Sequence, residues 1–214
     1  MELSRGTVLQ PNPTYSSPAP AQALERAGEA LRSRGFTVLL ASDRAMARDL
    51  ILGLIPQGAQ VGSGASSTLS ELGVTEVLEG SGRYDALRPR LRALDRATQG
   101  REIRKMGTAP DFWLNSVQAL TEGGQLLFAS ATGSQLAPIV YGAGSVILVV
   151  GAQKVVPDLE TAIARLEEYS FPLEDAKMRE LYDRGSAINE VLILSGESRP
   201  GRVTVVLLAE TAGN

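Results

Sequence analysis

The sequence contains no cysteine and no histidine among its 214 residues. Without cysteine, the chain cannot form a disulfide, hold an iron–sulfur cluster or bind zinc through thiolates. Without histidine, it lacks the side chain that most often acts as a general base near neutral pH and most often binds transition metals. Chemistry in this chain must therefore use carboxylates, hydroxyls, lysine, arginine, backbone amides or a bound cofactor. We predict no metal site and no cofactor held by this chain.

The sequence also has no apolar run of membrane-spanning length and no strong net charge. The longest nearly apolar stretch, residues 139–152, contains three glycines and is shorter than the roughly 18 residues that a membrane helix needs. The formal net charge of -3 gives no electrostatic case for binding nucleic acid or a membrane surface. Residues 1–13 lack the apolar segment of a signal peptide, so we expect a cytoplasmic protein.

The residues that are present predict a globular protein with a substantial core. Hydrophobic residues make up 43% of the chain, which is ordinary for such a protein. Several prolines near the N-terminus predict an extended arm over residues 1–20. Strand-like and helix-like segments alternate through residues 21–214. We therefore predict one α/β domain there, with a mostly parallel central sheet flanked by helices.

The individual elements follow from the spacing of apolar residues and from capping side chains. Helices are predicted over residues 21–34, after Ser42 or Asp43, from about Ser66, and after Asp158. Strands are predicted over residues 37–41, 60–62, 75–78, 112–115 and 146–150, with a hairpin turn at residues 122–124. Two apolar runs within residues 189–210 predict a C-terminal strand pair joined by a loop.

One segment, residues 83–105, is strongly basic. It carries eight lysines or arginines against three acidic residues, and Leu87, Leu91 and Leu94 have helical spacing. This pattern is typical of an amphipathic helix with a solvated cationic face. A docking surface for an acidic partner or an anionic substrate is the alternative. The near absence of aromatic residues argues against binding of single-stranded nucleic acid.

Three glycine- and hydroxyl-rich turns, each following an apolar run, are the most informative feature of the sequence. They lie within residues 61–73, 111–127 and 146–166. In an alternating strand–helix chain, such turns gather at the carboxyl ends of the strands, where open α/β sheets bind their ligands. We therefore predict that the three turns share one edge of the sheet.

The first turn combines glycines with the hydroxyls that open the next helix. Free amides and hydroxyls at a helix N-terminus form a natural seat for a phosphate or carboxylate. The pattern is neither a GxGxxG fingerprint nor a P-loop. Capping of the helix by Ser66 or Ser67 explains it equally well, so both interpretations stay open. The candidate ligand-binding residues are Gly62, Ser63, Gly64, Ser66 and Thr68.

The second turn adds further candidates for ligand binding, which are Asn115, Ser116, Thr121 and Gly124. It also contains Glu122, in a glycine-bounded position where an acidic side chain is usually just solvated. The functional interpretation of Glu122 is a general base, because no histidine can take that role, or a metal-binding carboxylate.

The third turn contains Lys154, which follows a buried strand and Gly151 and precedes further apolar residues. An unpaired buried ammonium is costly, so a lysine at this position calls for a partner. It can reach an anionic ligand, pair with Glu122, or lie with its stem along apolar surface and its head in water. We predict Glu122 and Lys154 as the catalytic or ligand-binding pair.

Taken together, these segments resemble the LUD domain, the family of lactate utilisation proteins related to lactate utilisation protein C. The resemblance runs from about Ala45 to the C-terminus and rests on four motifs in order. The matching residues are Gly62, Gly64, Ser66, Thr68, Leu69, Glu71 and Gly73; Asp111, Ala119, Thr121, Glu122 and Gly124; Gly151, Lys154, Val156, Asp158, Leu159, Ala162 and Ile163; and residues 201–210.

The resemblance implies a fold similar to the group of glucosamine-6-phosphate isomerase, ribose-5-phosphate isomerase and CoA transferases. It also implies a role in oxidising lactate to pyruvate beside iron–sulfur subunits. The chain departs from the family pattern at two places. Ser130 and Gln135 stand where relatives often carry an aspartate and an arginine, and residues 172–189 lack the cysteine-rich stretch of some relatives.

The leading hypothesis is a non-redox accessory subunit of a system that oxidises L-lactate to pyruvate. Its ligand is a small organic anion or a phosphate-bearing molecule, its partners are iron–sulfur subunits, and an oligomer stays open. One alternative is a stand-alone isomerase or transferase acting on a phosphorylated sugar or an acyl-CoA. Another is a ligand sensor without catalysis. Whether the chain is an enzyme is left open by the sequence.

Overall fold

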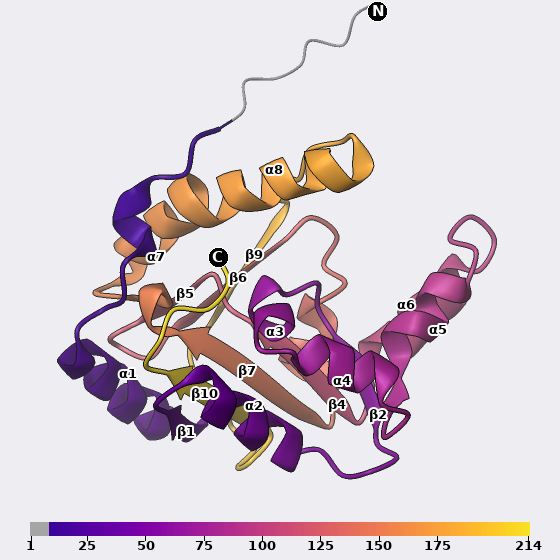
Figure 1. Cartoon of the computed structure of the whole chain (residues 1–214), viewed down its shortest axis with the longest axis horizontal. Coiled ribbons are helices and arrows are strands. Elements are labelled where there is room, and N and C mark those ends of the chain that lie inside the picture. The colour runs from indigo at the N-terminus through magenta and orange to yellow at the C-terminus, as the bar shows by residue number, and fades with distance from the viewer. Residues whose placement is uncertain (1–8) are drawn as a thin grey trace, which may run out of the picture.

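The computed structural model describes residues 9–214. At its centre lies a six-stranded parallel sheet with the strand order β1-β10-β7-β4-β2-β3 (Figure 1). The strands are β1 (Thr37–Ala41), β2 (Gln60–Ser63), β3 (Asp85–Ala86), β4 (Phe112–Ser116), β7 (Ser145–Gly151) and β10 (Val203–Leu208). The central strands β7 and β10 are almost continuously apolar, as is typical of parallel strands covered on both faces.

A second, four-stranded sheet has the order β8-β5-β6-β9. Its strands are β5 (Ala119–Thr121), β6 (Leu126–Ser130), β8 (Val155–Val156) and β9 (Glu190–Leu194). Side chains alternate between its two faces, as the period of a strand requires. Leu120 and Phe128 join the core beneath the central sheet, whereas Ala119 and Leu127 join a smaller core with α7 (Leu159–Arg165).

Helices cover both faces of the central sheet. On one face, α2 (Arg44–Gly53), α3 (Ser67–Glu71) and α4 (Val74–Gly80) contribute to one apolar core. On the other face, α1 (Ala21–Ser33) packs together with the second sheet. A π-helical turn (Leu166–Ser170) joins α7 to α8 (Phe171–Tyr182). Helices α5 (Leu87–Ala93) and α6 (Gly100–Thr108) project from the side of the molecule where β2 lies (Figure 1). Short helical turns lie at Pro13–Ser16, Pro138–Gly142 and Ala152–Lys154.

The predicted fold class is confirmed, and most predicted elements occur within a residue or two of their expected bounds. Asp43 and Asp158 cap their helices by accepting hydrogen bonds from Met46 and Thr161 amides. The hairpin turn is confirmed by a hydrogen bond from the Thr121 amide to the Gln125 carbonyl, at 2.9 Å. Within residues 9–214, no helix is long and apolar enough to cross a membrane.

Two predictions about elements were wrong. Residues 75–78 belong to helix α4, because Val74 and Leu78 are spaced four residues apart and are both buried on one helix face. The basic segment forms two helices, since Leu94 adopts an extended conformation after α5 and Asp95 then accepts hydrogen bonds from a turn.

The two predicted C-terminal strands are present but belong to different sheets. β9 pairs with β6 in the second sheet, whereas β10 lies between β1 and β7 in the central sheet.

The N-terminal arm is seen from residue 9, and its first eight residues lie outside the described part of the chain. The Asn12 amide donates to the Glu168 carbonyl at 2.8 Å and the Ala19 amide donates to the Ala152 carbonyl at 3.1 Å, so this part of the arm lies against the domain.

Candidate functional site

The three turns leave the central sheet at one edge, as predicted. β2, β4 and β7 are neighbouring parallel strands, so their carboxyl ends lie together. Thr68 lies on α3 after β2, Ser116 is the last residue of β4, and Lys154 ends the helical turn after β7. Thr68 forms direct hydrogen bonds there with Ser116, which lies 48 positions later in the sequence, and with Lys154, which lies 86 positions later.

The Lys154 side chain is buried, with 3% of the residue exposed. Its Nζ donates to Thr68 Oγ1 at 3.0 Å and to Ser116 Oγ at 2.9 Å. The Ser116 hydroxyl donates its own proton to the Val149 carbonyl at 2.7 Å. The Thr68 hydroxyl donates to the Ala212 carbonyl or to Ser116 Oγ, each at 3.2 Å. Both hydroxyls therefore act as acceptors toward the lysine.

The pKa of Lys154 is lowered from 10.5 to about 7, and burial is the largest cause because the charged form loses its hydration. The positive charge of Arg165 contributes to this shift, and the negative charge of Glu71 partly opposes it. None of the ion pairs formed within residues 9–214 includes Lys154. The lysine is thus held by neutral hydroxyls rather than by a carboxylate.

Arg165, at the end of α7, is a second buried cation. It is fully buried and donates from Nε to the Gln153 carbonyl at 3.0 Å and from Nη1 to Ser170 Oγ at 2.9 Å, with a further short contact from Nη1 to the Gln118 carbonyl. Its Nη2 has no hydrogen-bond partner among the described residues. Burial lowers the pKa of Arg165 to about 10. Like Lys154, it takes part in no ion pair within residues 9–214.

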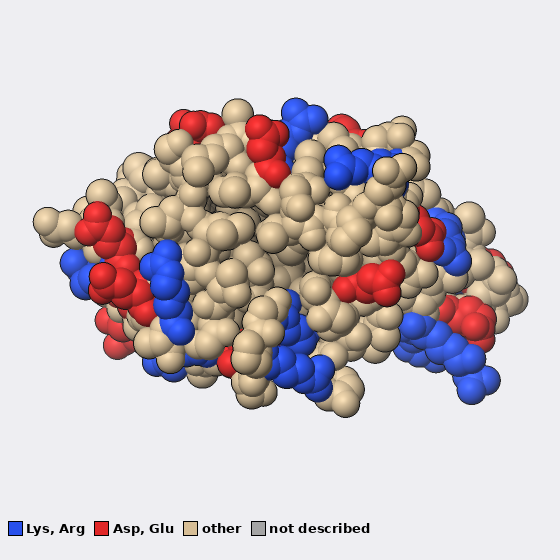
Figure 2. Space-filling view, turned by 90° about the horizontal axis from the view of Figure 1, so that it is seen from below, with Lys and Arg blue, Asp and Glu red and all other residues tan. Residues whose placement is uncertain are grey.

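The surface has a different charge pattern. On the face seen in Figure 2, charged side chains of both signs surround a largely uncharged middle. Many surface arginines have acidic partners, such as Arg90 with Asp85 at 2.8 Å and Arg92 with Glu79 at 2.9 Å. Among the buried cations of residues 9–214, Arg202 is paired with Glu197, whereas Lys154 and Arg165 have no carboxylate partner.

The predicted ion pair between Glu122 and Lys154 is not formed. Glu122 Oε2 instead accepts a 2.6 Å hydrogen bond from Arg26 Nε on α1. The Glu122 amide donates to the Val156 carbonyl in the second sheet. The reason lies in the chain path, because β5 leads away from the end of β4 into that sheet and carries Glu122 with it.

Thr121 and Gly124 belong to the same hairpin and serve its structure. Thr121 Oγ1 accepts from the Gln125 amide at 3.0 Å. Gly124 has a positive φ of 80° and lies so close to α1 that an added Cβ would be 2.8 Å from the Ala30 carbonyl carbon. The predicted ligand-binding residues Thr121 and Gly124 are therefore not brought to Lys154 by hydrogen bonds.

The first turn contributes one side chain to the cluster and uses much of its backbone for structure. Gly62 lies against the Trp113 ring, which an added Cβ would approach to 2.6 Å. Ser66 caps α3 by accepting from the Leu69 amide at 3.3 Å, and the Gly64 and Ser66 amides donate to backbone carbonyls. Ser63 is the last residue of β2 and is half-buried. Helix capping thus explains Ser66, and Thr68 is the residue that reaches Lys154.

Asn115 and Gly64 lie together beside the cluster. Asn115 Nδ2 donates to Gln135 Oε1 at 3.2 Å, and an added Cβ on Gly64 would lie 2.6 Å from Asn115 Oδ1. Gln135, which stands at one of the departures from the family pattern, thereby becomes part of the site's surroundings. Ser130, at the other departure, accepts hydrogen bonds from the Thr132 and Gly133 amides and stabilises a turn.

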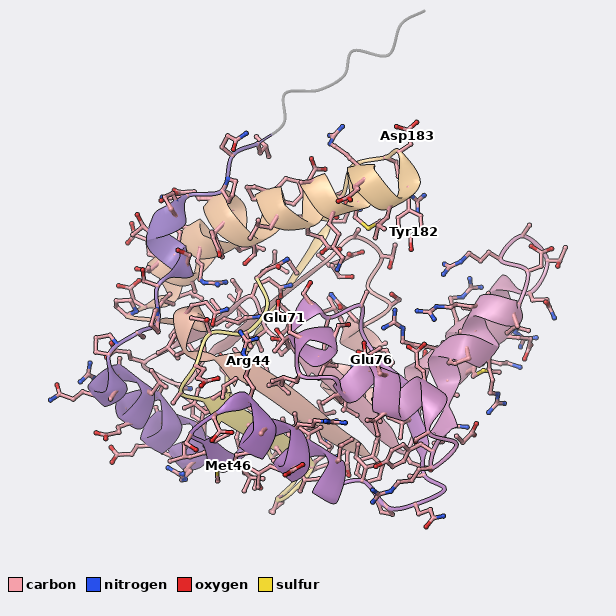
Figure 3. All side chains as sticks on the ribbon, in the orientation of Figure 1. Arg44, Met46, Glu71, Glu76, Tyr182 and Asp183 are labelled. Atoms are coloured by element: carbon pink, nitrogen blue, oxygen red, sulfur yellow. The ribbon has the colours of Figure 1, made fainter. Side chains whose placement is uncertain are left out.

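Sequence reasoning did not identify Arg165 or the C-terminal segment 211–213. Arg165 follows Ala162 by three residues on the apolar side of α7, and a charged residue at such a position was a usable signal. The C-terminal segment covers the cluster, since Gln153 Nε2 donates to the Ala212 carbonyl at 3.0 Å and the Gly213 amide donates to Glu71 Oε2 at 3.0 Å. Arg44 and Glu71 come together near this segment (Figure 3).

The fold and the site define an α/β protein with a buried cationic cluster at the carboxyl edge of a parallel sheet. The family model of the LUD domain matches residues 24–213, so the chain belongs to the LUD-domain family. This match begins earlier than the resemblance read from the sequence, which runs from about Ala45. Within residues 9–214, no group of three or more acidic residues is arranged to hold a metal ion.

Among solved structures, the chain is similar to the crystal structure of a DUF162 family protein from Deinococcus radiodurans. The TM-score is 0.54 and the sequence identity is 14%, and the match covers 88% of this chain and 97% of that chain. At this identity the likeness shows the fold alone. No curated protein sequence matches the chain significantly.

Proposed function

We propose that this protein is a non-redox accessory subunit of a lactate-oxidising system and that it binds a small organic anion. Membership of the LUD-domain family supports a lactate-utilisation-type protein in general. The finer role is inferred from the site and from the composition. We place the protein in the cytoplasm as part of the same proposal.

The observation that carries this proposal is the buried cation Lys154, held only by the hydroxyls of Thr68 and Ser116. A buried charge is expensive unless it is paired, and Arg165 adds a second positive charge close by. An anion entering this cluster would supply the missing negative charge. It would also accept charge-assisted hydrogen bonds, which are stronger than neutral ones.

The non-redox part of the proposal rests on the absence of cysteine and histidine. The chain therefore offers no thiolate for an iron–sulfur cluster and no imidazole for a haem or metal centre. Electrons from lactate would have to pass to a partner subunit. We expect such iron–sulfur subunits to co-purify with the protein from cells that make it.

Calorimetric titration with L-lactate, pyruvate and inorganic phosphate tests the binding step. We expect the wild-type chain to bind a small carboxylate and Lys154→Met to lose that binding. The matched control is Lys105→Met, because Lys105 is exposed and contacts only Glu102 at 3.5 Å. Equal binding by the two variants, or no binding by the wild-type chain, would remove the anion-binding proposal.

Experiments on the same purified protein test two alternative functions. Turnover of a phosphorylated sugar or an acyl-CoA by the chain alone would favour a stand-alone isomerase or transferase, the group of folds that the sequence motifs suggest. Tight binding of an anion with neither turnover nor a partner would favour a sensor. Recovery of no iron–sulfur partner, together with normal growth on lactate after deletion of the gene, would overturn the accessory role.

A further inference from the structure

We propose that Lys154 is a nucleophilic amine that forms a reversible imine with a small 2-oxo acid. This inference rests on the proposed function, because it makes the bound organic anion one that carries a carbonyl next to its carboxylate. It goes beyond anion binding by giving Lys154 a covalent role.

The directions of the hydrogen bonds support a reactive amine. The Ser116 proton is directed to the Val149 carbonyl at 2.7 Å, and the Thr68 proton has the Ala212 carbonyl and Ser116 Oγ at 3.2 Å, so both hydroxyl protons have acceptors other than Nζ. A neutral amine has two N–H groups, and the two acceptors Thr68 Oγ1 and Ser116 Oγ satisfy both. Its lone pair then remains unused. An ammonium would instead have a third N–H without an acceptor among the described residues.

The directions of these hydrogen bonds also argue against a serine nucleophile that is activated by the lysine. In such a dyad, the serine hydroxyl donates its proton to the amine nitrogen, which acts as the base. Here the Ser116 proton is directed to a backbone carbonyl 2.7 Å away. The cluster is therefore arranged to present the lysine nitrogen rather than the serine oxygen.

The surroundings of Lys154 match the two conditions that activate a lysine. Activation requires desolvation or a neighbouring cationic group, because both favour the uncharged amine. Burial of the side chain provides the first condition, and Arg165 provides the second. Lys105 and Lys177, the other lysines of the chain, lack these surroundings, since Lys105 is largely exposed and neither Lys105 nor Lys177 is buried.

The charge of the cluster selects the class of carbonyl compound. Imine formation needs an aldehyde or ketone, and the buried guanidinium of Arg165, whose Nη2 has no partner among the described residues, needs a negative charge. A small 2-oxo acid carries both groups on adjacent carbons. Once the imine is protonated, its positive charge is next to the carboxylate of the ligand, and this carboxylate also faces the positive field of Arg165.

The reaction balances without any further reagent. The Nζ lone pair attacks the carbonyl carbon and forms a C–N bond, while the carbonyl oxygen takes up a proton. The resulting carbinolamine loses its hydroxyl group as water, with a proton released from nitrogen, and a C=N bond forms. Hydrolysis reverses these steps and returns both the amine and the 2-oxo acid.

Access to the amine involves the C-terminal segment 211–213. Ala212 accepts a hydrogen bond from Thr68, and an added Cβ on Gly213 would lie 2.8 Å from the Thr68 amide nitrogen. A ligand reaches Nζ by displacing this contact or by entering beside Ser116, of which 9% is exposed. Either path favours a small ligand.

Trapping with sodium cyanoborohydride tests the inference on the intact chain. The protein is incubated with pyruvate as the probe and with the reductant, and adducts are located by mass spectrometry of peptides. With only three lysines in the sequence, each site gives a separate peptide signal. We expect the reduced pyruvate adduct at Lys154 and little at Lys105 or Lys177. Peptide mapping of the wild-type chain requires no variant, so the test does not depend on the folding of a mutant.

Matched reagents and variants sharpen the result. L-lactate has the carboxylate but no carbonyl and should give no adduct, and acetone has the carbonyl but no carboxylate and should label Lys154 poorly. Lys154→Met should lose the adduct, whereas Lys177→Met should keep it. Equal labelling of all three lysines would overturn the inference, because it would show ordinary surface reactivity.

The failure of the covalent step can be told apart from the failure of the proposed function. If pyruvate binds in calorimetry but no adduct is trapped at Lys154, the imine is wrong and anion binding stands. If neither pyruvate nor L-lactate nor phosphate binds, both proposals fall.

Discussion

The turns that follow β5 and β7 hold their charged side chains in opposite ways. Glu122, after β5, is a quarter exposed and has a cationic partner in Arg26 at 2.6 Å. Lys154, after β7, is buried and has two hydroxyl groups as partners. Both residues stand in glycine-containing turns after apolar strands. What distinguishes the candidate site from the scaffold is therefore a buried charge without a countercharge.

The largest expected effect concerns the stability of the protein as a function of pH. Lys154 titrates near 10.5 in the unfolded chain and near 7 in the folded one, so the unfolded chain binds more protons between these values. The free energy of unfolding should therefore rise as the pH increases from about 7 toward 10, by up to roughly 5 kcal/mol. Urea unfolding of the wild-type chain and of Lys154→Met across this range measures the difference. A parallel pH dependence of the two proteins would contradict the prediction.

The second effect concerns Arg165, which is buried beside the lysine. Arg165→Met leaves the Gln153 and Gln118 carbonyls and the Ser170 hydroxyl without their donor, which should cost about 2–4 kcal/mol of stability. It also removes a positive charge that lowers the pKa of Lys154. The pH range in which stability rises should therefore move upward. Arg179→Met is the control, because Arg179 forms a more exposed ion pair with Asp175.

The third effect is the loss of anion affinity in Lys154→Met. Removing a charged hydrogen-bond donor from the ligand should weaken binding by about 1.5–3 kcal/mol. Ser116→Ala, which keeps the lysine and removes one of its acceptors, should weaken binding by about 0.5–1.5 kcal/mol. Calorimetry with pyruvate measures both values. A larger loss in Ser116→Ala than in Lys154→Met would mean that the serine, rather than the lysine, contacts the anion.

The smallest effect is expected at Glu122. Glu122→Gln removes an ion pair whose arginine is 55% exposed, and such pairs contribute about 1 kcal/mol or less. Anion binding should be unchanged, because Glu122 has no contact with Lys154. A large loss of binding in this variant, measured by the same titration, would show that Glu122 contributes to the anion site and that the two turns do not differ in function.

Much of the fold could be predicted because its signals are local. The apolar runs of β7 and β10 indicate strands buried on both faces, and Asp43 and Asp158 mark the helix starts that they cap. Residues 75–78 were misassigned because the β-branched Thr75 and Val77 favour a strand. These residues form a helix instead, because the four-residue spacing of Val74 and Leu78 places both side chains on one buried helix face.

The site was less predictable because its contacts join distant parts of the chain. Lys154 stands out in the sequence since a lysine interrupts an apolar stretch. The partner of Glu122 lies 96 residues earlier on α1, and no local pattern indicates it. The hydroxyl partners Thr68 and Ser116 were among the candidates, but their convergence on one amine depends on the strand order of the folded sheet.

The position of β10 has a consequence for how the chain folds. This strand, Val203–Leu208, lies between β1 and β7 and is hydrogen-bonded to both, although it is the last strand in the sequence. Until it is synthesised, β1 and β7 each present an unpaired edge, and β1 cannot join the rest of the sheet. Long-range strand pairing of this kind folds slowly and exposes edges that aggregate. The central sheet can therefore become complete only after β10 has been synthesised, although β1 lies more than 160 residues earlier in the sequence.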